Sequence, residues 1–274
     1  MGTVALLRRY PVKSMLGEDV ERAEVTGAGI VGDRVSALVD RATGKVASAK
    51  NPRLWRGLLD LRAETVGAGE VRVTAPDGTV VHGRDEDVDA VLSRLVGREV
   101  TLAHTPPEEA ELDRSTPEEV LSGGLDAETT ADVLRIGEHA PGTFLDFAPL
   151  HLIATGTLAH IGALRGKGPV AAVRYRPNLV VETDGSGFVE NEWLGRVLTV
   201  GDELVLRTVA ATPRCALPTL DHGGTGRDTD ALRVPARHNR FVPYRGWGPE
   251  PCVGVYTQVV REGRVSAGDV VRLR

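Results

Sequence analysis

Short runs of apolar and β-branched residues, each bounded by turn residues, recur along most of this 274-residue chain. In the first hundred residues they occupy residues 4–10, 20–26, 34–40, 58–65, 71–74 and 79–81. Such runs predict strands. The 32 glycines and 16 prolines suit a chain with many turns between them. We therefore expect a mostly β protein with a few helices, of the α+β class.

Turn and helix signals in the first half refine this expectation. Residues 42–45 and the Asp77-Gly78 pair predict tight hairpins. Residues 85–96 place four apolar side chains on one helical face and begin with acidic residues, which predicts one amphipathic helix. Residues 99–103 return to a strand pattern.

The second half repeats the strand pattern. A helix is expected from residue 155 or 157 to 165, because a threonine precedes it and Gly166 follows it. Strands are expected at residues 150–153, 178–182, 196–200, 203–211, 253–261 and 270–273. Strands outnumber helices in both halves, so we expect two β units closed as barrels or rolls.

An acidic stretch separates the two halves. Residues 105–138 hold ten acidic and two basic residues, while the remaining chain is slightly basic. The stretch also contains prolines and a glycine pair, so we interpret it as a solvated, partly mobile connection. The alternative is a docking surface for a basic protein. The predicted division is an N-terminal domain at 1–104, a connecting segment at 105–138 and a C-terminal domain at 139–274.

Composition excludes several classes of protein. A net charge of −5 argues against a general nucleic-acid binder. Two cysteines cannot build a disulfide framework, a four-cysteine zinc site or an iron–sulfur cluster within this chain. No apolar run is long enough to span a membrane, and the N-terminus lacks a signal-peptide pattern, so we expect no membrane association. The prediction is a cytoplasmic protein with reduced thiols.

Cys215 is the first candidate for chemistry. It follows a predicted strand and lies between Pro213 and Pro218, which restrict its loop. The neighbouring Arg214 can stabilise the thiolate, the form that acts as nucleophile or metal ligand. A lone thiolate suits a soft metal whose other ligands belong to a cofactor. The alternative is a buried apolar cysteine, which is also our interpretation of Cys252, at the start of an apolar strand.

A lysine and a serine follow a strand that ends at a proline. In the sequence Tyr-Pro-Val-Lys-Ser, Lys13 offers a charge and Ser14 a hydroxyl donor, a pair that suits phosphate or another anion. A plain surface loop is the alternative.

Arginines beside glycine or proline form a further set of candidates. Arg34, Arg53 and Arg176 are held near such residues, and Arg174 belongs to the same segment as Arg176. Guanidinium groups bind phosphate and carboxylate with two hydrogen bonds. Each could instead pair with a structural acid such as Asp33 or Asp40.

Two weaker candidates remain. Asp146 precedes a predicted strand and could orient a substrate. The glycine-rich loop at residues 221–227 would allow a ligand close to the backbone, or would simply be a flexible loop. The seven histidines show no metal-ligand spacing, so no zinc site is predicted.

Taken in order, these motifs resemble the MOSC family, named for the C-terminal domain of the molybdenum-cofactor sulfurase. The set comprises Tyr-Pro-Val-Lys-Ser at 10–14, Gly-Asp-Arg at 32–34, Asn-Pro-Arg-Leu at 51–54, Arg-Pro-Asn at 176–178, Glu-Trp-Leu-Gly at 192–195, Gly-Asp at 201–202, Arg-Cys at 214–215 and Gly-Val-Tyr at 254–256. The resemblance covers nearly the whole chain. It implies a MOSC N-terminal β-barrel domain followed by a MOSC β-barrel domain.

The resemblance also implies a cofactor and its contacts. Members bind molybdenum through molybdopterin, and by position Cys215 matches the cysteine that ligates the metal. The implied cofactor contacts are Lys13, Ser14, Arg34, Lys50, Arg53, Arg176, Asn178 and Arg214.

The nearest pattern is that of amidoxime-reducing components and bacterial reductases of N-hydroxylated compounds. It implies two-electron reduction of a small N-hydroxylated or N-oxide substrate, with Asp146 on the substrate side. Because this chain has no cysteines for an iron–sulfur cluster, electrons would come from a separate ferredoxin- or flavoprotein-type partner. The alternatives are a sulfur carrier with a persulfide on Cys215 and a non-catalytic module that handles the cofactor.

Overall fold

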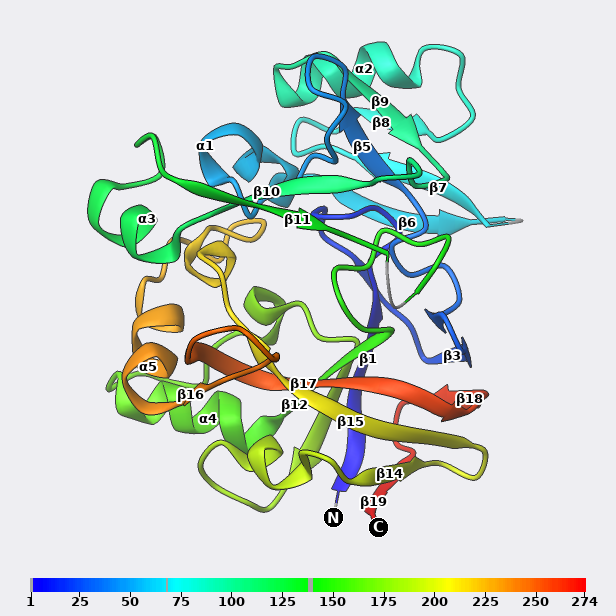
Figure 1. The fold of residues 1–274 in the computed structure, drawn as a ribbon. Helices are drawn as coiled ribbons and strands as arrows, with labels where there is room; N and C mark the ends of the chain where they lie inside the picture. Colours follow the sequence, from blue (N-terminus) through cyan, green and yellow to red (C-terminus); the bar gives the residue numbers. More distant parts are fainter. Residues whose placement is uncertain (1, 68, 138–139) are drawn as a thin grey trace.

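The structure, a computed structural model, describes residues 2–67, 69–137 and 140–274. The described residues form nineteen strands and five α-helices, so the prediction of a mostly β protein with a few helices is confirmed. Figure 1 shows a barrel that carries both chain termini and a smaller β unit at the other end of the molecule. The predicted boundary at residues 138 and 139 lies outside the described residues.

Seven strands of the described chain form the closed barrel. Around the ring they are β12 (Leu150–Ala154), β13 (Leu179–Thr183), β1 (Gly2–Arg9), β19 (Val270–Leu273), β14 (Val197–Val200), β15 (Leu204–Pro213) and β17 (Glu250–Arg261). Antiparallel pairing of β12 with β17 closes the ring. Alternate apolar side chains point inward and form a buried core.

The first strand of the chain lies in the barrel formed mainly by the second half. β1 pairs antiparallel with β13 and β19, and its Val4 and Leu7 are buried in the barrel core. The loop that leaves β1 therefore begins at the barrel and runs directly toward the smaller unit. This crossing brings residues 10–14 close to the second half of the chain. The division at residues 104 and 138 remains a prediction.

The smaller unit packs two sheets and short helices around its own core. Its elements are β5 (Ala37–Asp40) paired with β9 (Val100–Ala103), the sheet β6 (Arg62–Val66), β7 (Glu70–Thr74) and β8 (Val80–His82), α1 (Pro52–Trp55) with the 3-10 helix η1 (Arg56–Asp60), and α2 (Val88–Val96). The predicted helix and both predicted turns occur. Gly78 takes a left-handed φ of 87° at the tighter turn, and Gly97 ends the helix in the same conformation.

Two predicted strands start three or more residues later than the sequence pattern indicates. Residues 58–60 are 3-10 helix, because Leu58 and Leu59 are both buried and a strand would turn one of these neighbours outward. The run at residues 34–40 becomes a strand only at Ala37, since Arg34 has a left-handed φ of 48°.

The described residues of the acidic segment contain regular structure that the sequence pattern did not reveal, while the role of the segment as a connection stays a prediction. β10 (Glu111–Ser115) and β11 (Ala131–Arg135) form an antiparallel hairpin around α3 (Pro117–Gly123). Leu112 and Ile136 are buried in a small core with Phe144. The net charge of the segment did not indicate this core, because the polar residues on one face of a strand outnumber the apolar residues on the other face.

The remaining elements flank the barrel or connect the units. They are β2 (Glu18–Asp19), β3 (Arg22–Thr26), β4 (Gly29–Ile30), α4 (Thr155–Leu164), η2 (Ala172–Tyr175), η3 (Val189–Trp193), η4 (Leu217–Thr219), α5 (Asp230–His238), β16 (Arg240–Phe241) and β18 (Gly263–Ser266). The sequence pattern did not reveal α5, β16 or β18. None of the helices in the described residues is long and apolar enough to cross a membrane.

Candidate functional site

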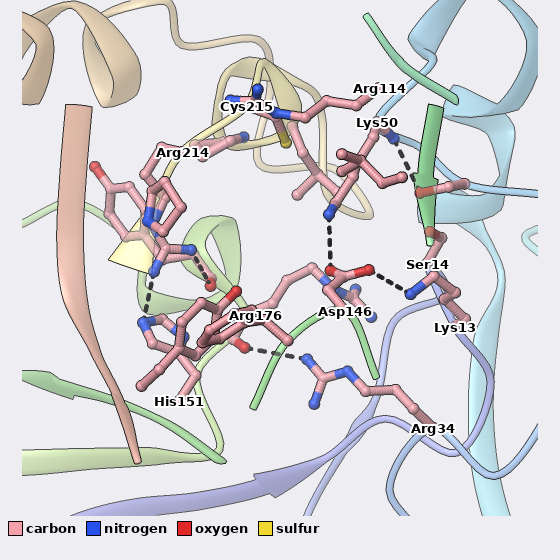
Figure 2. Close-up of a pocket in the computed structure, with 18 of the residues that line it drawn as sticks. Lys13, Ser14, Arg34, Lys50, Arg114, Asp146, His151, Arg176, Arg214 and Cys215 are labelled. Carbon is pink, nitrogen blue, oxygen red and sulfur yellow. Dashed lines mark hydrogen bonds and ion pairs between the residues drawn. The ribbon is translucent and has the colours of Figure 1, made fainter. Parts of the chain in front are cut away.

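A cavity of about 330 Å³ is lined by residues from both halves and from the acidic segment. Most of the predicted site residues line it together (Figure 2): Lys13, Ser14, Arg34, Lys50, Asp146, Arg176, Arg214 and Cys215. These residues are far apart in sequence, so the cavity exists only in the folded chain. We call Lys13, Arg34, Lys50 and Arg176 the cationic collar.

Two predicted residues lie outside this lining. Arg53 is 44% exposed and is 3.8 Å from Glu128, in a surface ion pair. Asn178 is buried behind the collar, where its Oδ1 accepts a hydrogen bond from the backbone N–H of His151 and its Nδ2 donates to Asp33. Asn178 thus holds the base of the cavity rather than its surface.

Backbone strain is concentrated at the cavity. Ser14, Arg34 and Arg176 have φ values of 64°, 48° and 52°, and they are the non-glycine residues with left-handed backbone in the described chain. All three line the cavity. Such conformations cost roughly 1–3 kcal/mol each and cluster at binding and catalytic sites.

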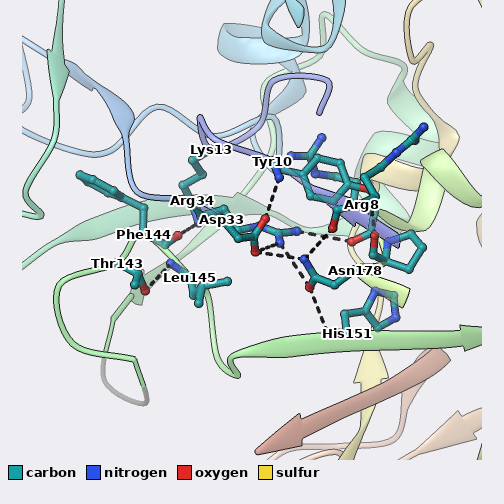
Figure 3. A network of polar contacts seen from close by, with 12 residues as sticks. Arg8, Tyr10, Lys13, Asp33, Arg34, Thr143, Phe144, Leu145, His151 and Asn178 are labelled. Carbon is teal, nitrogen blue, oxygen red and sulfur yellow. Dashed lines mark hydrogen bonds and ion pairs between the residues drawn. The ribbon is translucent and has the colours of Figure 1, made fainter. Parts of the chain in front are cut away.

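A buried network of polar contacts supports the collar (Figure 3). Two guanidinium groups stack on the Tyr10 ring, with Arg34 Cζ 4.5 Å and Arg176 Cζ 4.1 Å from its centroid. The carboxylate of Asp33 accepts hydrogen bonds from Tyr10 N at 2.7 Å, Arg34 Nη1 at 2.5 Å and Asn178 Nδ2 at 3.1 Å. Asp33 is therefore the structural acid that the sequence offered as a partner for Arg34.

Asp146 lies between two lysines. Its carboxylate is 2.6 Å from Lys13 Nζ and 3.0 Å from Lys50 Nζ, and Lys13 also donates to the Phe144 carbonyl. Burial alone would raise the pKa of Asp146, but the two ammonium groups outweigh it and hold this pKa well below its ordinary value. Burial lowers the pKa of Lys13 to about 8, against the opposing effect of Asp146.

Cys215 lines the cavity where β15 ends. Its loop is fixed by Arg214, which donates to the carbonyls of Tyr175 at 3.0 Å and Val253 at 3.1 Å and lies 2.5 Å from His151 Nε2. Burial, and then the charge of Arg214, lowers the pKa of His151, so a neutral imidazole accepts the Arg214 hydrogen bond. Arg214 therefore positions the cysteine loop through the backbone.

One polar atom of the collar lacks a partner. Arg176 is 8% exposed, and its Nη2 is buried without a hydrogen bond among the described residues. Its other terminal nitrogen, Nη1, donates to the Met15 carbonyl at 2.7 Å. Buried N–H groups are nearly always paired, so this donor fits an acceptor supplied by a bound anion.

The donor set fits a cofactor with a soft metal and a phosphate. Cys215 supplies one thiol to the cavity, while Cys252 is buried in β17. The described residues contain no cluster of three or more histidine, cysteine, aspartate or glutamate side chains placed to hold a metal. A metal beside Cys215 would accordingly take its other ligands from a cofactor.

Several lining residues were not among the candidates from the sequence. They are Ser48, Arg114, Leu134, Arg135, Phe147, His151, Tyr175, Pro213, Leu217, Pro218, Tyr244, Trp247 and Tyr256. Arg174, one of the candidate arginines, also lines the cavity. It donates to four backbone carbonyls of the loop at residues 218–226, including that of Leu220 at 2.8 Å, which orders this glycine-rich loop.

Fold and site together define a class of protein: a two-unit β protein with a deep, cationic cavity around one cysteine, suited to an anionic ligand. Residues 139–272 match the MOSC domain, and residues 1–110 match the MOSC N-terminal beta barrel domain. The chain belongs to the MOSC family.

Relatives extend over the whole chain. It is 25% identical to mitochondrial amidoxime-reducing component 1 of Homo sapiens over 100% of this chain and 83% of that protein. It is 26% identical to mitochondrial amidoxime reducing component 2 of Homo sapiens over 99% of this chain and 83% of that protein. The crystal structure of the YUAD protein from Bacillus subtilis aligns with a TM-score of 0.44 at 11% identity, over 99% of this chain and 94% of that one.

Proposed function

We propose that the cavity binds a molybdenum cofactor through Cys215 and that the protein reduces N-hydroxylated or N-oxide compounds. One observation carries the proposal: the Cys215 thiol and the unpartnered Arg176 Nη2 belong to the same cavity. The names of the relatives, amidoxime-reducing components, support the choice of substrate class.

The collar has the charges and donors that the cofactor needs. Lys13, Arg34 and Arg176 would hold its phosphate, with the Ser14 hydroxyl beside them. Cys215 would complete the metal's ligands, and Arg214 would hold the cysteine in place. When bound, the cofactor supplies a metal centre that exchanges two electrons and accepts an oxygen atom.

The overall reaction balances with two electrons and two protons. They convert an N–OH group to N–H and release water, and an N-oxide loses its oxygen in the same way. Asp146 stays ionised, since its pKa is held well below its ordinary value, so its carboxylate accepts a hydrogen bond from the substrate. Lys13 Nζ, with a pKa of about 8, is the group here that can give up and regain a proton near neutral pH.

Electrons reach the site from a separate ferredoxin- or flavoprotein-type protein, because two cysteines cannot hold an iron–sulfur cluster in this chain. We place the protein in the cytoplasm, where its two free thiols stay reduced.

Turnover of a small amidoxime tests the proposal. Protein made with added molybdate and given an artificial electron donor should convert acetamidoxime to acetamidine. Cys215→Ser should abolish turnover, whereas Cys252→Ser, which changes the other buried thiol, should retain it. Equal turnover by the wild type and Cys215→Ser would contradict the proposal.

The sulfur-carrier alternative makes a different prediction. It requires cyanide-labile sulfur on Cys215 and no turnover with any donor. Sulfur release from the wild type but not from Cys215→Ser, without reduction of the amidoxime, would favour the carrier.

A further inference from the structure

The chain has few aromatic residues, and they are unevenly placed. It contains three tryptophans, four tyrosines and four phenylalanines. Five of these eleven rings line the cavity, and four of the five follow one another by ring contacts. These four are Tyr256, Phe147, Tyr244 and Trp247, which we call the aromatic wall.

The ring contacts form a continuous row, tilted by 35° and 36° at Phe147 and edge-to-face between Tyr244 and Trp247. The centroids of Phe147 and Tyr256 are 5.8 Å apart, those of Phe147 and Tyr244 are 3.8 Å apart, and those of Tyr244 and Trp247 are 5.3 Å apart. Arg114, from the β10–β11 hairpin, ends the row with its Cζ 5.6 Å from the Trp247 ring. The acidic segment thus helps to hold the wall in place.

The wall is not part of a hydrophobic core. Trp55 and Trp193 are 6% and 2% exposed and pack in the two main cores. All four wall residues are half-buried instead, and none belongs to a core cluster of the described chain. Half-buried rings along a cavity provide a stacking surface for a planar ligand.

One wall residue offers an unused hydrogen bond. The hydroxyl of Tyr244 is buried and has no partner among the described residues. Burial raises the pKa of Tyr244, so the phenol keeps its proton and can act as a donor. An acceptor atom on a stacked ligand would satisfy it.

The charges of the lining residues restrict the class of ligand further. Among the described residues that line the cavity, eight are lysine or arginine and one, Asp146, is a carboxylate. This excess repels a cationic ligand and favours a neutral or anionic one. The wall is also separate from the collar, since Arg34 and Arg176 stack on Tyr10 instead.

We infer that the aromatic wall binds a planar aromatic group of the substrate, neutral or anionic, with the Tyr244 hydroxyl as hydrogen-bond donor. The inference rests on the proposed function and adds the part of the substrate away from the N–OH group. It makes Trp247 and Tyr244 determinants of specificity.

Binding without an electron donor tests this inference directly. Benzamidoxime and acetamidoxime differ by the aromatic ring, and calorimetry of the full chain compares their dissociation constants. The wild type should bind benzamidoxime about tenfold more tightly, and Trp247→Leu should lose roughly three- to tenfold of that preference. Trp247→Phe, which keeps a ring, should retain most of the preference. Phe188→Leu should also retain the preference, because it removes a half-buried ring that lies outside the cavity.

Two further measurements test the charge of the preferred ligand and whether the wall serves the cofactor instead of the substrate. A benzamidoxime with a para carboxylate should bind more tightly than one with a para aminomethyl cation. The molybdenum content of Trp247→Leu should equal that of the wild type. Loss of metal from this variant would mean that the wall serves the cofactor, and it would overturn the inference.

The outcomes distinguish the inference from the proposed function. Equal binding of the two amidoximes, or an unchanged preference in Trp247→Leu, overturns the inference even if both compounds are reduced. An aromatic preference that depends on Trp247, combined with no reduction of either compound, upholds the wall as a binding surface and overturns the proposed reductase.

Discussion

The two sides of the cavity are held by different forces. The cationic collar rests on buried charges: Asp33 accepts three hydrogen bonds, and two guanidinium groups stack on the Tyr10 ring. The aromatic wall is held mainly by contacts between half-buried rings and by Arg114 at its end. The first side suits an anionic group, whereas the second suits a planar aromatic group.

Backbone conformation shows the same contrast. The left-handed non-glycine residues of the described chain lie at the collar or next to it, and none lies in the aromatic wall. Such strain persists where surrounding contacts over-determine the backbone. The collar is therefore rigid before a ligand arrives, and substitutions below it should have larger effects than substitutions in the wall.

The largest expected effect is that of Asp33→Ala. Removing this buried carboxylate leaves the Arg34 guanidinium without its ion partner, which typically costs about 3–5 kcal/mol of unfolding free energy. Urea denaturation measures the loss. Trp247→Leu, in the wall, should cost less. The matched control is Asp19→Ala, which removes a 55% exposed partner of Arg8 and should cost no more than about 1 kcal/mol. If Asp33→Ala and Asp19→Ala lowered the unfolding free energy by similar amounts, the collar would not depend on its buried carboxylate.

The second-largest expected effect is a dependence of folding stability on pH that arises from Lys13. The folded-state pKa is about 8 against an ordinary 10.5, so the charged lysine opposes folding fully below pH 8 and progressively less as the pH rises toward 10.5. The stability of the wild type relative to Lys13→Met should therefore increase by on the order of 2 kcal/mol between about pH 7 and pH 10.

Lys50→Met is the control for the range between about pH 7 and pH 10. The pKa of Lys50 is raised, since Asp146 and the Cys215 sulfur outweigh its burial, so its contribution to stability stays constant below 10.5. A pH-independent difference for Lys13→Met would show that Lys13 is not desolvated as described.

A smaller effect tests the strained backbone at Ser14. Ser14→Ala and Ser14→Gly both lose the hydroxyl that accepts a hydrogen bond from Ala49 N at 3.1 Å. The glycine variant should be about 1 kcal/mol more stable than the alanine variant, because a left-handed residue with a Cβ costs roughly 1–2 kcal/mol. Thermal unfolding compares the two; an alanine variant of equal or greater stability would argue against strain at the collar.

The smallest effect is expected at Arg53. The resemblance placed this residue at the cleft, but it is exposed and pairs with Glu128 at the surface. Arg53→Ala should change the unfolding free energy by less than about 0.5 kcal/mol and leave the molybdenum content unchanged. A loss of bound metal would show that the collar extends beyond the residues that line the cavity.

Local sequence signals selected several residues that line the cavity, but they did not reveal the aromatic wall. The Lys-Ser and Arg-Cys motifs each place two candidate residues side by side, so a short pattern was enough to select Lys13, Ser14, Arg214 and Cys215, which all line the cavity. The wall forms between the loop before β12, the loop before β17 and β17 itself. Its ring contacts depend on the packing of these distant segments, which no local pattern records.

The composition of the acidic segment likewise did not indicate which of its residues are buried. Its net charge indicated a solvated connection, yet Leu112 is buried and Arg114 reaches the cavity, where it pairs with Glu250 and stacks on Trp247. Composition averages over the two faces of a strand, whereas burial depends on each face separately.

Metal content is the most direct test of the central claim, that Cys215 and the collar hold a molybdenum cofactor. Elemental analysis of protein made with added molybdate should find equimolar molybdenum in the wild type and in Cys252→Ser. Cys215→Ser should contain almost none, with unchanged circular dichroism and thermal unfolding. Wild-type levels of molybdenum in Cys215→Ser, or no molybdenum in any of the three proteins, would contradict the account.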